Sequence, residues 1–141
     1  MRTRMAHSIS TLCLLATVAV AGACGRKASG GTGALAVTDI DLGRSLNADL
    51  TIADKTTTFH PNDVIYASVA TKGTGNATLN ARWTFQDNQQ VSTDSRTVAP
   101  NAPAHTEFHV SKPSGWPVGH YRVEITLNGV SAGTKDFDVK Q

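Results

Sequence analysis

The fold class of this chain is decided by residues 115–130, GWPVGHYRVEITLNGV. Apolar side chains occupy alternate positions from residue 121 to residue 127, and polar side chains fill the positions between them. This period of two predicts a strand with one buried face. Asn128 and Gly129 follow, and both tolerate the positive φ that a type I′ turn requires. Because residues 130–139 then return as a second strand, the C-terminal part is predicted to be a β-hairpin that packs on further strands.

Residues 1–23 have the architecture of a secretory signal peptide. Arg2 and Arg4 give a positive start, and the apolar, small-residue run that follows is too short for a membrane span. The whole chain has 13 Lys+Arg and 11 Asp+Glu, so removing these two arginines leaves a mature chain without net charge. Since no basic run remains, no nucleic-acid partner is expected.

Residues 20–24, VAGAC, resemble the lipobox of bacterial lipoproteins. The resemblance implies that Cys24 is lipidated and becomes the mature N-terminus, which would hold the protein on a membrane through several acyl chains. An ordinary signal peptide with an incidental cysteine is the alternative. In this family an Asp after the cysteine retains the protein at the inner membrane, so Gly25 favours the outer membrane of the cell envelope.

Residues 24–34 are predicted to be the lipidated cysteine and a flexible linker, because the segment is rich in glycine and serine. The folded domain is predicted over residues 35–141. Cys13 and Cys24 both precede this domain, so it must be held together without a disulfide.

Residues 35–141 contain short segments of alternating polarity separated by turn signals, and no convincing helix. A change of parity inside the first segment predicts a β-bulge, and the polar character of residues 90–98 predicts an edge strand. The predicted fold is therefore an antiparallel β-sandwich of about seven strands. Its strands are expected at 35–42, 64–70, 78–86, 90–98, 105–110, 121–127 and 130–139, with a shorter alternation at 50–52.

The segment 59–139 resembles bacterial immunoglobulin-like domains of exported proteins. The resemblance is carried by Phe59, Pro61 and Asp63, by Trp83 in a central strand, and by Trp116, Pro117, Gly119 and Tyr121. It implies an immunoglobulin-like sandwich with a tyrosine corner at Tyr121. The cysteine pair of antibody domains is absent, and the resemblance leaves the ligand open.

His105, Glu107 and His109 form the sharpest candidate for chemistry, because alternate strand residues share one face. Metal binding is one interpretation, and a solvated polar face opposite Phe108 is the other. We favour the polar face, since two histidines and one carboxylate at this spacing do not converge unaided. No catalytic residue, resident metal or cofactor is expected, because the chain has no nucleophile elbow and no phosphate-binding glycine loop.

Trp116 also has two interpretations. In a loop with proline and glycine it could be exposed and contact a protein or a sugar. Alternatively, it folds back as a lid over the end of the sandwich, which is the interpretation that we favour.

These observations predict a lipid-anchored cell-envelope protein with a non-catalytic binding or assembly module for an unidentified protein partner. A carbohydrate- or peptidoglycan-binding module that uses Trp116 is the alternative function. A metal-binding protein or an enzyme centred on His105, Glu107 and His109 is the third.

Overall fold

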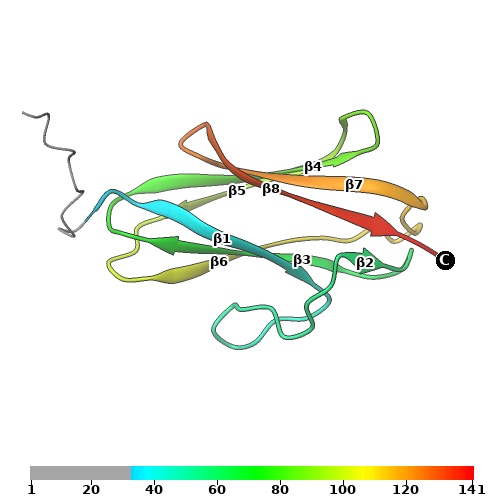
Figure 1. Ribbon diagram of the computed structural model, residues 1–141, viewed down its shortest axis with the longest axis horizontal. Helices are drawn as coiled ribbons and strands as arrows, with labels where there is room; N and C mark the ends of the chain where they lie inside the picture. Colours follow the sequence, from blue (N-terminus) through cyan, green and yellow to red (C-terminus); the bar gives the residue numbers. More distant parts are fainter. Residues whose placement is uncertain (1–32) are drawn as a thin grey trace, which may run out of the picture.

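The computed structural model describes residues 33–141, which fold into eight strands without a helix (Figure 1). A three-stranded sheet has the order β1-β3-β6, and a five-stranded sheet has the order β2-β8-β7-β4-β5. The two sheets pack face to face, which confirms the predicted all-β sandwich. The strands are β1 (Ala36–Gly43), β2 (Thr58–Phe59), β3 (Ile65–Lys72), β4 (Ala77–Phe85), β5 (Gln89–Val98), β6 (Ala104–Val110), β7 (Gly119–Leu127) and β8 (Val130–Val139).

The predicted details of the long strands are confirmed. The register between β1 and β3 shifts between Val37 and Asp39, which is the predicted bulge. Asn128 and Gly129 have φ values of 50° and 81°, as the type I′ hairpin between β7 and β8 requires. β5 lies at an edge of the large sheet, as its polar sequence indicates.

The region between β1 and β3 differs from the predicted pattern in two places. β2 is a two-residue strand that the sequence did not indicate, and it pairs with β8 in parallel, so the sandwich is not wholly antiparallel. Residues 50–52 are not a strand, because Leu50 has a φ of 65° and Ile52 forms only an isolated bridge to Leu46. This segment loops away from β1, and tertiary contacts rather than strand pairing bury Ile52.

The core lies between the two sheets and is built from inward side chains of all the strands except β5. Aromatic rings gather around Phe137, whose centroid lies 5.5 Å from that of Phe59, 5.9 Å from Trp83 and 5.3 Å from Tyr121. The Trp83 Nε1 atom is the one buried side-chain polar atom of residues 33–141 that lacks a hydrogen-bond partner. The core is therefore apolar and aromatic, without a buried polar network between the sheets.

The two long sides of the sandwich differ. On one side β1 packs against β8, and on the other side β5 and β6 make few contacts. The side chains of Ser92, Asp94 and Arg96 pair with inward residues of β4 and are only half-buried. In the part of the chain that the structure describes, no helix is long and apolar enough to cross a membrane.

Candidate functional site

Trp116 closes one end of the sandwich, between β6 and β7. Its side chain is 5% exposed, and the indole Nε1 donates a hydrogen bond of 3.0 Å to the carbonyl oxygen of Asp63. The Trp116 backbone N–H donates to the carbonyl oxygen of Pro61 at 2.7 Å. The prediction of a lid is thus confirmed. The alternative of an exposed Trp116 that stacks on a sugar is not what the structure has.

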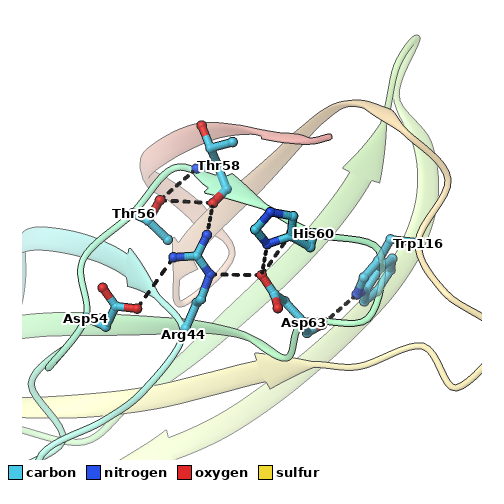
Figure 2. A network of polar contacts seen from close by, with 7 residues as sticks. All are labelled: Arg44, Asp54, Thr56, Thr58, His60, Asp63 and Trp116. Carbon is cyan, nitrogen blue, oxygen red and sulfur yellow. Dashed lines mark hydrogen bonds and ion pairs between the residues drawn. The ribbon is translucent and has the colours of Figure 1, made fainter. Parts of the chain in front are cut away.

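Figure 2 shows the polar network that holds the turn below Trp116. Arg44, at the end of β1, donates from Nε to Asp63 Oδ2 at 2.9 Å and from Nη2 to the carbonyl oxygen of Thr58 at 2.7 Å. The same Asp63 oxygen accepts the backbone N–H of His60 at 2.8 Å. Arg44 therefore links β1, β2 and the turn that carries Asp63, and through that turn it positions Trp116.

The electrostatics of this network keep Asp63 ionised. Partial burial raises the pKa of Asp63, but the His60 N–H and the Arg44 guanidinium outweigh it and hold that pKa below the ordinary 3.8. The hydrogen bond to Asp63 in turn raises the pKa of Arg44. Sequence reasoning missed Arg44, because its partners lie 10 to 19 positions away and no motif links them.

The tyrosine corner is present at Tyr121, as predicted. Its hydroxyl donates to the carbonyl oxygen of Pro117 at 2.7 Å, and burial raises the pKa of this phenol. The Tyr121 ring lies edge-on to Trp116 with centroids 5.9 Å apart and contacts Phe85 at 4.6 Å. The bonds of Trp116 and the hydroxyl of Tyr121 thus hold the loop that precedes β7.

A groove runs beside Trp116, between β5 and the chain that follows β6. It consists of two adjoining hollows of about 400 and 290 Å³ that share Val91, Lys112 and Trp116. Val91 is the extra residue of a bulge, because Trp83 pairs with Ser92 and Thr84 with Gln90. Bulges at sheet edges redirect side chains, and Val91 is 37% exposed here. Sequence reasoning missed this groove, since it depends on which strands become edges.

His105, Glu107 and His109 share one face of β6, as predicted, but the structure does not bring all three together. Glu107 Oε1 contacts His109 Nδ1, whereas His105 Nδ1 lies 3.2 Å from Ser68 Oγ on β3. Within residues 33–141 there is no cluster of three or more such side chains with the geometry to hold a metal ion. The arrangement is a polar outer face with paired side chains.

Ser68, His105 and Asp49 have the residue types of a hydrolytic triad. Their hydrogen bonds, however, do not connect them as a triad requires. The Ser68 hydroxyl donates to the carbonyl oxygen of Leu50 at 2.7 Å, and the residue is 3% exposed. The Asp49 carboxylate is bound mainly by the hydroxyl and N–H of Thr51, which lower its pKa. These bonds fix the segment between β1 and β2 on the outer face of the small sheet.

The predicted lipid-attachment residue, Cys24, lies outside the described residues, as do the predicted signal peptide and almost all of the predicted linker. The described chain begins at Gly33, whose carbonyl oxygen accepts the N–H of Thr74 at 3.1 Å. The chain thus enters the domain where β3 passes into β4.

Solved structures of similar fold include an immunoglobulin-like protein of Pseudomonas aeruginosa, with a TM-score of 0.53 and 15% identity. That match covers 79% of this chain and all of the other. The domain is an immunoglobulin-like β-sandwich. An alkylpurine DNA glycosylase of Pseudomonas fluorescens, solved with DNA containing an abasic-site analogue, matches with a TM-score of 0.50 and 11% identity, over 76% of this chain but 30% of its own. No protein-family model and no curated protein matches the chain.

Proposed function

We propose that this chain is a lipid-anchored protein of the bacterial cell envelope whose immunoglobulin-like domain binds a protein partner without catalysis. The lipobox-like residues 20–24 and the glycine-rich residues that follow support the anchor. Gly25, in the place of an inner-membrane retention signal, supports the outer membrane. The sandwich supports a binding role, because such domains present loops and strand edges from a rigid frame.

The observation that carries the proposal is the distance between the chain entry and the groove. Gly33 and Ala34 are held at Thr74, just before β4 begins, whereas Phe85 at the other end of β4 lines the groove (Figure 1). Nine strand residues span about 30 Å. A lipid at Cys24 would therefore hold one end of the domain near the membrane and leave the groove end facing away from it.

Metabolic labelling with a fatty acid tests the anchor. We expect label on the wild-type protein and on a Cys13→Ser control, and neither label nor membrane retention after Cys24→Ala. Label that persists after Cys24→Ala would refute lipidation at this residue.

Site-specific photo-crosslinking in intact envelopes tests the binding role. Val118, near the groove, is 48% exposed, and Val130, on the hairpin at the other end, is 71% exposed. A photo-reactive residue at position 118 should give one dominant protein adduct, and the same residue at position 130 should give none. The absence of an adduct at 118, or the same adducts at both positions, would contradict the proposal.

A further inference from the structure

We propose that the groove beside Trp116 is one end of a strand-binding site, where an extended, carboxylate-bearing segment of a protein partner adds to the free edge of β6. This inference rests on the proposed function and specifies its surface and its partner. Four features of the described residues support it: an open strand edge, a polar strip facing it, a redirected valine, and an uncompensated lysine.

The open edge belongs to β6. In residues 33–141 this strand pairs with β3 alone, so one row of its backbone N–H and C=O groups has no strand partner. Such a row is a template for an added strand, and β-strand addition is a common way for sheets to bind extended peptides. The edge is seven residues long, which is enough for several backbone hydrogen bonds.

The wall facing this edge is β5. Its inward side chains include Ser92, Asp94 and Arg96, which are polar and only half-buried, and only Val98 at the far end of the strand is apolar and packs on the core. Arg96 lies over the Phe108 ring at 5.7 Å and pairs with Asp94 at 3.1 Å. Half-buried polar side chains leave less apolar packing to be disrupted by an entering strand than a fully packed apolar edge does.

The groove provides side-chain contacts at one end of the proposed strand-binding site. The bulge at Val91 directs an apolar side chain toward the same hollow that Val110 and Trp116 line. A side chain of the added strand can therefore contact Val91, Val110 and Trp116 while its backbone follows β6. This combination of backbone bonds and a side-chain pocket is what gives strand addition its specificity.

Lys112 favours a negatively charged group on the segment that binds in the groove. No Asp or Glu lines either hollow, and Lys112 takes part in none of the ion pairs formed within residues 33–141. The neighbouring His109 is already paired with Glu107. An ammonium group in a groove without a carboxylate of its own favours a carboxylate, so the segment should carry Asp or Glu where it passes Lys112.

Peptide display on the full mature chain, purified in detergent, tests the site. Random twelve-residue peptides are selected on the wild-type protein, and the best binders are synthesised with a fluorescent label. We expect one recurrent Asp or Glu, and an affinity that falls about tenfold or more in Lys112→Glu, as loss of one charged contact predicts. Lys72→Glu, the same charge change at the exposed far end of β3, should leave the affinity unchanged.

Amide hydrogen exchange of the complex provides the decisive readout. Bound peptide should slow exchange along Ala104–Val110 and leave β1 unaffected, because only the free edge of β6 gains backbone hydrogen bonds. Protection of β1 instead of β6 would contradict the proposed site. Peptides that lack a carboxylate and bind Lys112→Glu as tightly as the wild type would also contradict it.

The same experiments separate the other occupants. If sedimentation shows a dimer that Lys112→Glu dissociates, the occupant is a second copy of this chain and the proposal is wrong. If deleting residues 25–32 is needed before peptides bind, the occupant is the chain's own N-terminal segment and the proposal is also wrong. Should no peptide bind while the adduct at position 118 persists, this site fails and the proposed function stands. Loss of that adduct would count against the proposed function itself.

Discussion

The two long sides of this sandwich are closed in different ways. On the β1/β8 side the chain passes from the small sheet to the large one, and backbone bonds from Arg44 to Asp54 and from Thr56 to Leu42 seal the end of β1. On the β5/β6 side residues 99–103 connect the end of β5 to the start of β6, and Arg96 contacts Phe108 across the two edges.

This difference bears on the strand-binding site that we propose. On the closed side, the β1/β8 side, the edge strand β1 packs against β8 and its end is bonded to residues 54 and 56, and the other edge strand, β2, is only two residues long. On the open side both edge strands are long, and β5 carries inward Asp94 and Arg96, a known defence of edge strands against unwanted pairing. The groove lies at the end of β6 that is nearest to Trp116, where Val110 and Trp116 both line it.

Trp116 takes part in both sides, so its removal should have the largest effect. Trp116→Ala deletes a buried ring beside Tyr121 and the bond to Asp63, and we expect a loss of about 3–5 kcal/mol in the free energy of unfolding. Trp116→Phe keeps most of the apolar contact and should lose about 1–2 kcal/mol. Urea denaturation measures both, and an unchanged midpoint in Trp116→Ala would show that the lid does not stabilise the fold.

Gly43 tests the closed side. A Cβ atom at this position would overlap the carbonyl oxygen of Asp54 and the side chain of Ile52, and backbone cannot easily move. Gly43→Ala should therefore cost about 2–3 kcal/mol. Gly133→Ala is the matched control, because its nearest neighbour, at 2.8 Å, is the flexible tip of Ile40. Equal thermal midpoints for the two variants would mean that the segment between β1 and β2 is not held as described.

The elements that sequence predicted well are those whose pattern is local. The strict alternation of β4 and β7 can be read within each strand. The turn between β7 and β8 can be read from Asn128 and Gly129 alone. The tyrosine corner was also predictable, because a resemblance marked it, and the Trp116 lid was the favoured of two interpretations although the loop composition allowed exposure.

The elements that sequence did not predict depend on residues far apart. β2 is too short to show a period, and it exists because Phe59 packs on Phe137 and its strand pairs with the end of β8. Arg44 reaches Asp63 across 19 positions. The groove follows from a bulge at Val91 and from the order of strands in two sheets, and neither leaves a local signal.

Asp63 tests the electrostatics of the closed side. Asp63→Asn weakens the bonds to Arg44 and to the His60 N–H, and we expect a loss of about 1–2 kcal/mol at neutral pH. The folded state lowers the pKa of Asp63, so its contribution is complete above the ordinary 3.8 and is lost as pH falls through the lower folded value. The wild-type and variant stabilities should therefore converge below about pH 4 in urea titrations. A difference that stays constant down to the acid limit would assign the effect to packing instead.

One arginine on each side makes a similar contact, so the pair allows a direct comparison with the smallest expected change in stability. Arg44 and Arg96 each place a guanidinium 5.7 Å from the ring of a buried phenylalanine, Phe59 and Phe108 respectively. Arg44 also makes hydrogen bonds to Asp63 and Thr58, whereas Arg96 adds only its surface pair with Asp94.

Arg96→Ala should therefore lower the free energy of unfolding by about 0.5–1 kcal/mol, the size of one exposed cation–π contact. Arg44→Ala should lower it by clearly more, because a part-buried carboxylate and a backbone carbonyl oxygen lose their donor. Parallel urea denaturation of the two variants measures both losses in the free energy of unfolding. Equal losses would mean that hydrogen bonds do not distinguish the sides, whereas a larger loss in Arg96→Ala would show that the β5/β6 side is the more tightly held and poorly suited to admit a strand.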